Sequence, residues 1–420
     1  MFGSLANAWK IPELRKKLIF TAAMIVIYRF GAHVPVPGID VNAINQFINN
    51  TANQQSILGF LNLFSGGALT RFAVFALGIM PYITASIILQ LLTMAFPSLK
   101  ELAREGEHGQ QKITQYTRYL TVALAVAQSV GFTVLFAQQG IIQLTPLKFY
   151  EIVITLTAGT ILLMWIGELM TQHGIGNGIS LLIFASIVSG LIPGLYRFLN
   201  PATTSVFTIV VMLGIGAVVI AGIVLVQEGQ RRINIQYAKR QIGRRMTTGG
   251  STYLPLSINM AGVIPVIFAS SVLMFAPTIA RFFPNYGAAS WFANWLRPSG
   301  PAFLITEAIF IIGFTYFYTA VQFDPVERAS DLKKYGGFIP GIRPGRPTAV
   351  YLDRVLTRLT LPGAIFLAAI AVLPSILISG LGITFYFGGT SILIVVGVAL
   401  QTMQQMESQL LMRHYEGFLK

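Results

Sequence analysis

The side chains that could do chemistry in this sequence are mainly basic, and they gather in two long polar stretches. The first covers residues 228–257 and the second covers residues 323–358. Lysine and arginine at this density attract phosphates and carboxylates, so both stretches are candidates to dock an acidic or phosphate-rich partner. Attraction to anionic lipid is the simpler alternative, since each basic residue near a membrane surface adds about 1 kcal/mol.

Patterns typical of catalysis and cofactor binding are missing from the sequence. We find no P-loop, dinucleotide fingerprint, zinc-protease helix or nucleophile elbow. The four histidines (His33, His108, His173 and His414) are far apart, and the chain has no cysteine. The glycine-rich run at 174–178 joins two apolar segments, which indicates a tight turn rather than a phosphate cradle. We therefore expect no enzyme activity, no cofactor and no metal site.

The elements that must carry the basic stretches are apolar segments long enough to cross a bilayer. Of the 420 residues, 54% are hydrophobic and only 10% are charged, whereas a soluble domain has roughly 25% charged residues. Because 18 or more consecutive apolar residues can span a membrane, we predict ten helical spans. They lie at about residues 18–37, 73–95, 118–137, 150–170, 179–198, 205–227, 259–279, 302–322, 359–378 and 385–405.

The connections between these spans predict their orientation. Of the 29 Lys and Arg residues, 23 fall on one side of the membrane and five on the other, so both termini are expected to be cytoplasmic. Five spans lie in an N-terminal half, residues 1–200, and five in a C-terminal half, residues 201–420. An odd number of spans per half inverts one half relative to the other, and such halves usually leave a pathway at their interface.

Charged residues inside the predicted spans are scarce. Arg29, Glu168 and Glu307 sit at or near span ends. An ion-coupled transporter usually places ionisable groups deep in its spans, so this scarcity argues against a pump or exchanger. A secondary transporter built from inverted repeats remains the alternative to a passive channel.

Residues 57–72 are apolar, but they are too short and too interrupted by Ser65, Gly66 and Gly67 to span a membrane. Pro81 follows inside a predicted span. Irregular backbone at membrane depth is tolerated where protein buries it or water reaches it. We therefore expect a short helix that folds back into the mouth of a cavity, and we expect Pro81 and, in the seventh span, Pro265 to permit bending.

Eight sequence motifs in order resemble the SecY family, whose members form the channel of the bacterial Sec protein translocase. They are FSGGAL at 64–69, ALGIMPYI at 76–83, QYTRY at 115–119, GIGNGIS at 174–180, YAKRQ at 237–241, NMAGVIP at 259–265, FIPGIRPG at 338–345 and FYFGGTS at 385–391. The resemblance covers essentially the whole chain. It implies an all-α polytopic membrane protein in which ten transmembrane helices form two inverted, pseudo-symmetric halves around an hourglass pore, with a short re-entrant plug helix.

The resemblance also implies roles for individual residues. A pore ring would consist of Ile79, Ile83, Ile179, Ile183, Ile267 and Ile394. The plug, at about residues 57–72, would include Phe60, Phe64, Ser65, Gly66 and Gly67. A lateral gate between spans 2 and 3 and spans 7 and 8 would include Thr84, Ser86, Gln90, Gln128, Asn259, Ser270 and Ser271. Docking residues would be Lys239, Arg240, Arg244, Arg245 and Arg343.

The function implied is a protein-conducting channel in the bacterial plasma membrane. It would pass unfolded preproteins and release signal sequences and transmembrane segments sideways into lipid. The implied partners are the small membrane subunits SecE and SecG, the motor ATPase SecA, the ribosome through its RNA phosphates, preprotein signal sequences and anionic lipids. An apolar ring can block ions by dewetting, and it offers no fixed hydrogen bonds that would select among passing side chains.

Overall fold

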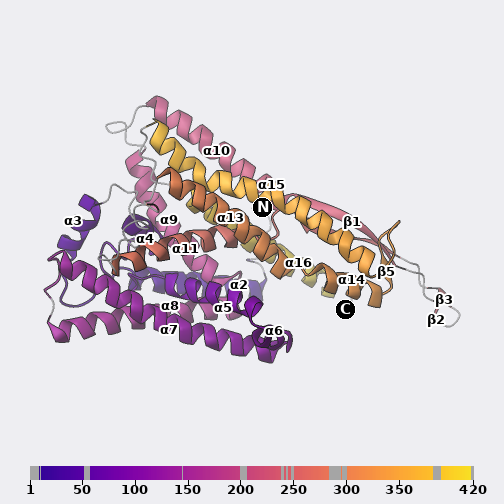
Figure 1. Ribbon diagram of the computed structural model, residues 1–420, viewed down its shortest axis with the longest axis horizontal. Coiled ribbons are helices and arrows are strands. Elements are labelled where there is room, and N and C mark those ends of the chain that lie inside the picture. The colour runs from indigo at the N-terminus through magenta and orange to yellow at the C-terminus, as the bar shows by residue number, and fades with distance from the viewer. Residues whose placement is uncertain are drawn as a thin grey trace.

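The structure is a computed structural model that describes residues 9, 11–51, 57–143, 145–198, 206–237, 241–242, 245–246, 250–282, 295, 300–381 and 389–417. These residues form mainly long helices that run in broadly the same direction (Figure 1). The long helices are α2 (Pro12–Gly31), α5 (Met80–Ala95), α7 (Glu107–Gln138), α8 (Pro146–His173), α9 (Gly178–Phe198), α10 (Val206–Glu228), α11 (Ile264–Phe282), α13 (Pro301–Gln322), α15 (Arg346–Leu381) and α16 (Gly389–Gly417). Shorter helices are α3 (Val41–Thr51), α4 (Ile57–Phe64), α6 (Pro97–Arg104) and α14 (Pro325–Lys334).

Each predicted span overlaps one of the long helices, which confirms a helical polytopic architecture. Within the described residues, five helices are long and apolar enough to cross a membrane, and the bent pair α5 and α6 would make a sixth. The apolar parts of α9 and α11 that the structure describes are shorter. α2 carries Arg15, Lys16 and Lys17 near its start, so part of its length is polar.

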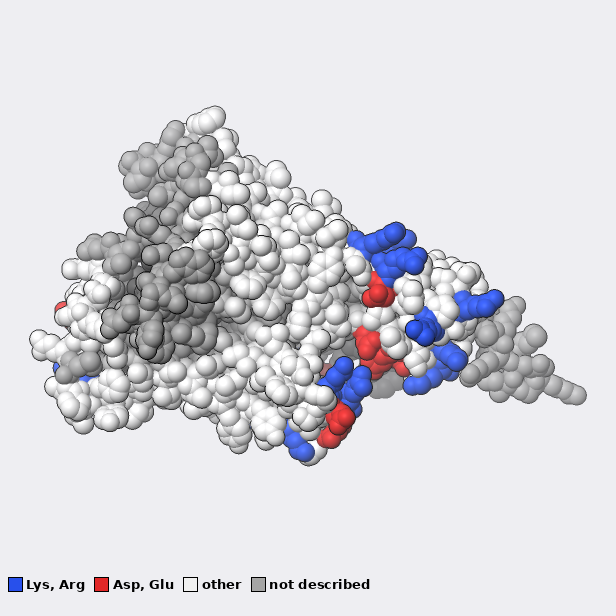
Figure 2. Space-filling view, in the orientation of Figure 1, with Lys and Arg blue, Asp and Glu red and all other residues white. Residues whose placement is uncertain are grey.

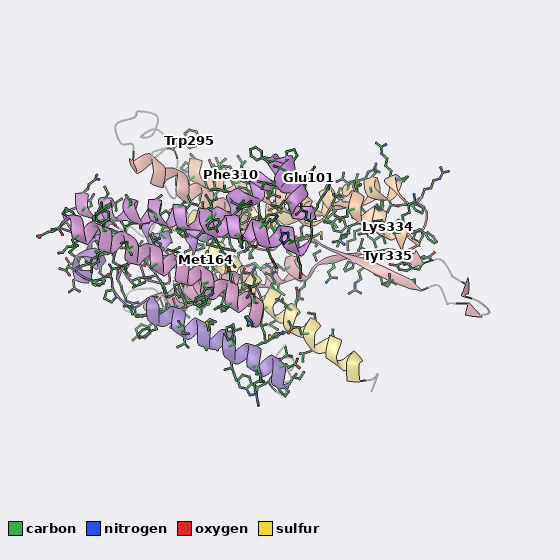
Figure 3. The ribbon with its side chains drawn as sticks, turned by 90° about the horizontal axis from the view of Figure 1, so that it is seen from below. Glu101, Met164, Trp295, Phe310, Lys334 and Tyr335 are labelled. Carbon is green, nitrogen blue, oxygen red and sulfur yellow. The ribbon has the colours of Figure 1, made fainter. Side chains whose placement is uncertain are left out.

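Charged side chains are concentrated at one end of the bundle. In Figure 2, most blue and red atoms on the visible face lie at the right, near α14 and the start of α15, while the rest of the described surface there is almost white. Figure 3 places Lys334 and Tyr335 at this end and Trp295 at the opposite end. The predicted orientation puts the same residues on opposite sides of the membrane, so the two sides of the predicted topology correspond to the two ends of the bundle.

The backbone around the start of α5 differs from the predicted second span. That span was expected from residue 73. Residues 65–72 and 74–79 instead form turns, Ala73 forms a single antiparallel β-bridge with Pro35, and α5 begins only at Met80. Gly66, Gly67 and Gly78 have positive φ angles of 65°, 81° and 59°, a conformation that glycine adopts without the steric cost of a side chain. α2 likewise ends at Gly31 rather than near residue 37.

The two prolines expected to bend gate helices do not interrupt them. Pro81 is the second residue of α5, and Pro265 is the second residue of α11. In the first turn of a helix the missing N–H has no intrahelical partner to lose, and the fixed φ of proline suits the helix. The prediction of proline-induced bending was therefore wrong. Each proline lies in the first turn of its helix, directly after a segment of turns.

The two basic stretches form a small β-sheet that the all-α prediction did not include. Strands β1 (Gln230–Tyr237) and β4 (Ser251–Ser257) pair antiparallel over most of their length. β5 (Gly337–Phe338), from the second stretch, adds to the other edge of β1, so the order is β4-β1-β5. Between β1 and β4 in the chain, the two-residue strands β2 (Gln241–Ile242) and β3 (Arg245–Met246) pair antiparallel with each other.

Alternating burial on β1 explains why this segment is a strand. Ile233 and Ile235 are buried, whereas the residues around them are exposed. Ile233 packs in an apolar cluster with Leu256 of β4 and Leu352 of α15. The sheet is therefore attached to the start of α15, and the two basic stretches form one structural unit, which we call the basic platform (β1–β5, α14 and residues 339–358).

Candidate functional site

The six isoleucines expected to line a pore belong to, or pack against, one large apolar cluster. Ile79, Ile83, Ile183, Ile267 and Ile394 are buried members of one apolar cluster, and Ile179 is partly buried and packs against it. They come from the start of α5, from α9, from α11 and from α16. The Ile83 amide donates to the Ile79 carbonyl at 3.1 Å, so this pair stands one turn apart on one helix face.

The segment expected to form a plug lies against this cluster. α4 ends at Phe64, whose side chain is 2% exposed and belongs to the same apolar cluster as the isoleucines. The turn after it contains Ser65 and Gly66, both buried, and Gly67, which is partly buried. Phe60 lies within α4, but its side chain is outside the described part of the chain.

Two residues of α2 hold the turn of the expected plug through its backbone. The Tyr28 hydroxyl donates to the Ser65 carbonyl at 3.1 Å and also contacts the Ser186 hydroxyl of α9. The Arg29 guanidinium donates from Nη1 to the Gly66 carbonyl at 3.0 Å and to Ser189 Oγ at 2.8 Å. The turn is thus bonded to α2, and the same two residues of α2 bond to α9. We call Tyr28, Arg29, Ser186 and Ser189 the plug clasp.

Gly66 fits closely into this clasp. A Cβ atom at residue 66 would lie 3.1 Å from Arg29 Nη1, from Ser186 Cα and from Ser189 Oγ. At Gly67, whose φ is also positive, nothing lies within 4 Å of such an atom. Sequence reasoning missed the clasp, although an arginine inside an apolar span is a signal for a functional contact.

The residues expected to form a lateral gate lie on helices that pack together, but their hydroxyls bond within their own helices. Thr84 donates to the Met80 carbonyl, and Ser270 and Ser271 donate to carbonyls one turn earlier in α11. α5 packs against α11 and α7, and α11 packs against α13. Among the side chains that the structure describes, no hydrogen bond joins α5 to α11, so apolar contacts hold this seam.

The remaining residues expected at the lateral gate include three with side-chain amides, Gln90, Gln128 and Asn259. Gln90 Nε2 is 3.5 Å from Ser86 Oγ, a long hydrogen bond within α5, and Asn259 Nδ2 donates to the Gly262 carbonyl at 2.9 Å. The oxygens Gln90 Oε1 and Asn259 Oδ1 are buried without a partner. Gln128 lies on α7 and is partly buried. A buried acceptor without a partner costs roughly 1–3 kcal/mol.

The expected docking residues are only partly covered by the structure. Arg343 is exposed at the tip of a turn between Gly341 and Gly345, whose φ angles are 82° and 99°. The Thr348 hydroxyl donates to the Arg343 carbonyl at 2.9 Å and braces that turn. Arg245 belongs to β3, without a description of its side chain, and Lys239, Arg240 and Arg244 lie outside the described residues.

The other charges expected at span ends have different surroundings. Glu168 of α8 accepts two hydrogen bonds from Arg118 of α7, at 2.9 Å and 2.6 Å, which join the two helices. Glu307 is not at an end: it lies almost two turns into α13 and is 6% exposed. Groups of His, Cys, Asp or Glu that could hold a metal ion are absent from the described part of the chain.

Comparison with known proteins places this geometry among protein translocation channels. The family model described as SecY matches residues 73–403. A protein translocase subunit SecY of Streptomyces galbus is 48% identical over 437 residues, which cover all of both chains. The solved structure titled "The structure of a protein conducting channel" matches with a TM-score of 0.65, at 20% identity and 96% of each chain. A Sec61 from a canine ribosome-channel complex matches with a TM-score of 0.62, also at 20% identity and 96% of each chain.

Proposed function

The chain belongs to the SecY family and is the protein-conducting channel of the Sec translocase, and we propose how its residues perform that function. It is a channel rather than an enzyme, and the family assignment removes the alternative of a secondary transporter. The two halves, residues 1–200 and 201–420, enclose the path of an unfolded preprotein. The path passes the isoleucine cluster, with the turn after α4 as its plug.

The observation that carries this proposal is that the isoleucines and Phe64 belong to, or pack against, the same apolar cluster. Such a constriction in the closed channel is dry, because apolar side chains offer water no hydrogen bonds and can exclude it. Isoleucine is restricted at χ1, which keeps the constriction defined. When the plug leaves, the same side chains can part around a passing chain without binding any particular residue.

We propose that signal sequences and transmembrane segments leave sideways between α5 and α7 on one side and α11 and α13 on the other. The apolar seam between α5 and α11 supports this route, because contacts without cross-helix hydrogen bonds can be replaced by contacts with an apolar guest helix. The unpaired oxygens of Gln90 and Asn259 also favour opening. Each could accept a hydrogen bond from a guest segment or from water once the seam widens.

The energy for transport must come from a partner, and we propose that it is delivered at the basic platform. Docking there by SecA or by the ribosome is supported by the exposed Arg343 and by the concentration of charge at that end of the bundle (Figure 2). SecE and SecG would complete the complex, and anionic lipids would contact its basic side. We place the assembly in the bacterial plasma membrane, with both termini cytoplasmic.

A reconstitution tests this function directly. The chain, assembled with SecE and SecG in sealed vesicles, is supplied with SecA, ATP and a preprotein that carries a signal sequence. We expect a protease-protected preprotein, and its amount should fall to background without ATP or with a preprotein lacking its signal. No protected product under the complete conditions would refute the proposal.

A further inference from the structure

The ion pair between α7 and α8 is one residue away from a contact with the proposed pore ring. Arg118 Nε and Nη2 donate to the two carboxylate oxygens of Glu168 at 2.9 Å and 2.6 Å. The residue of α8 before Glu168 is Gly167, which is buried. A charged contact between two helices is thus adjacent to a position inside the bundle.

Two isoleucines of the proposed ring pack against α8 at Gly167. A Cβ atom at residue 167 would lie 3.1 Å from Ile179 Cγ1, 3.4 Å from Leu182 Cδ1 and 3.6 Å from Ile79 Cδ1. The first distance is shorter than the roughly 3.5–4.0 Å of an ordinary contact between carbon atoms, so Ile179 lies against the α8 backbone itself. Ile179 is the second residue of α9 and Ile79 directly precedes α5. One position of α8 therefore supports ring residues from two other segments.

The rotation of α8 about its own axis decides which residue faces these isoleucines. Neighbouring residues of an α-helix are about 100° apart, so a small rotation would replace Gly167 by Ile166 or Glu168. Apolar contacts define such a rotation weakly, because they are not directional. A bidentate pair between a guanidinium and a carboxylate has two parallel hydrogen bonds, which fix orientation as well as distance.

Tyr82 connects the same ion pair to α5. Its side chain is partly buried and packs against the apolar cluster that contains the ring. It also interacts electrostatically with both Glu168 and Arg118. Tyr82 directly precedes Ile83 of the ring, so the ion pair has a neighbour on α5 as well as on α8.

We propose that Arg118 and Glu168 are positioning residues for the N-terminal half of the pore ring, on which they act through Gly167. This inference rests on the proposed role of the isoleucines as a dry constriction, and it assigns a task to an ion pair outside that constriction. Without the pair, α8 is free to rotate and the isoleucines that pack on Gly167 lose their support. Ile267 and Ile394 come from α11 and α16, in the other half of the chain, and keep their support.

Thiol accessibility measures the two halves of the ring separately. The chain has no cysteine, so Ile179→Cys or Ile267→Cys introduces a single thiol into the channel, assembled with cysteine-free SecE and SecG in nanodiscs. A water-soluble maleimide reacts with the thiolate, and its rate reports how far water reaches that residue. We expect Glu168→Ala to raise the rate at residue 179 several-fold and to leave the rate at residue 267 unchanged. An equal rise at both residues, or no rise at residue 179, would overturn the inference.

Two further variants separate positioning from general loss of stability. Glu168→Gln keeps an acceptor for Arg118 and should raise the rate at residue 179 less than Glu168→Ala does. Ser129→Ala is the matched control, because it also removes a contact between α7 and α8: the Ser129 and Thr157 hydroxyls are 3.3 Å apart. Thr157 is about 15 Å from Gly167 along α8, so the rate at residue 179 should not change. A rise in this control as large as in Glu168→Ala would also contradict the inference.

The same thiols test the ring on which the inference rests. With the ion pair intact, both should react slowly in the resting channel and faster when SecA and ATP hold a stalled preprotein inside it. Fast reaction at rest would refute the dry ring itself. Slow reaction at rest, together with no effect of Glu168→Ala at residue 179, would refute only the positioning role of the ion pair.

Discussion

The hydroxyl of Tyr28 donates a hydrogen bond to the main-chain carbonyl of Ser65, 37 residues further along the chain, at 3.1 Å. The two residues are buried, and the bond joins α2 to the turn that follows α4. A buried hydrogen bond between distant segments stabilises one arrangement of those segments over others. The position of the turn after α4 therefore depends in part on this one phenol.

We predict that Tyr28→Phe loosens the plug. The variant keeps the ring, which stacks on Phe75 at 6.0 Å. It removes the hydroxyl's hydrogen bond to the Ser65 carbonyl, which keeps only the 3.3 Å bond from the Ala68 amide, at a cost of about 1 kcal/mol. Ion leak through the resting channel in a planar bilayer should rise roughly fivefold. Tyr316→Phe is the control, because its hydroxyl also donates to a carbonyl, that of Thr357, on the exposed side of α13. A leak as large in the control would contradict this role for Tyr28.

A second prediction compares two neighbouring glycines. Gly66→Ala and Gly67→Ala both place a methyl group on a residue with positive φ, which costs roughly 1–2 kcal/mol in either case. Only the methyl group at residue 66 meets Arg29, Ser186 and Ser189. We expect Gly66→Ala to raise the resting leak and to admit preproteins with defective signal sequences, and we expect Gly67→Ala to do so much less. Identical behaviour of the pair would mean that backbone strain, and not the clasp, decides the plug position.

The proposed pore ring leads to a third prediction. Ile83→Asn should raise the resting ion conductance, because an amide in the constriction stabilises water there. Ile87 is one turn further along α5, is 2% exposed and packs in the same apolar cluster. Ile87→Asn should therefore destabilise the protein to a similar degree, by roughly 1–3 kcal/mol for a poorly paired buried amide, without the same conductance. Comparable conductance in both variants would exclude a special role for residue 83.

The ion pair between α7 and α8 should contribute measurably to stability. Arg118→Ala leaves Glu168, whose side chain is 12% exposed, without its bidentate partner. We expect a loss of about 1–3 kcal/mol, as for a buried acceptor that loses its partner, measured by unfolding in detergent with a double-mutant cycle against Glu168→Gln. The Lys334–Asp331 pair is the exposed comparison, at 72% and 38%, and Asp331→Asn should change stability by less than about 0.5 kcal/mol. A coupling near zero for Arg118 and Glu168 would show that the pair is not a structural link.

The fifth prediction concerns docking. Arg343→Glu should impair SecA-dependent transport and leave membrane insertion and assembly with SecE intact, because the side chain is exposed and its turn is braced through the backbone. Lys148→Glu makes the same change of charge at the start of α8, on the predicted external side, and should transport normally. Normal transport by Arg343→Glu would remove that residue from the docking surface.

The helices of this protein were predictable from sequence, because a long apolar run that crosses a membrane can satisfy its backbone hydrogen bonds by itself only as a helix. The isoleucine positions followed from motifs, and the structure brings all six side chains into one cluster. The strands were missed because β1 carries only two buried positions, Ile233 and Ile235, among exposed polar residues. A search for apolar residues at every second position would have found this short alternation and predicted a strand.

Other features lay beyond any local pattern. Tyr28 meets Ser186, which is 158 residues away in the chain, and no spacing within a helix indicates such a contact. The start of α5 also could not be placed from hydropathy, because residues 74–79 are as apolar as a helix interior but form turns. Pro81 was expected to bend a helix, and it instead occupies the first turn.

The plug clasp bonds to main-chain atoms, so its hydrogen bonds do not depend on the side chains of residues 65 and 66. Tyr28 and Arg29 bond to carbonyl oxygens that every amino acid possesses, so most substitutions in the plug leave the two bonds available. A changed side chain in this turn can therefore alter its packing while both hydrogen bonds stay in place. Residue 66 is the exception, because a Cβ atom there would lie 3.1 Å from Arg29, Ser186 and Ser189.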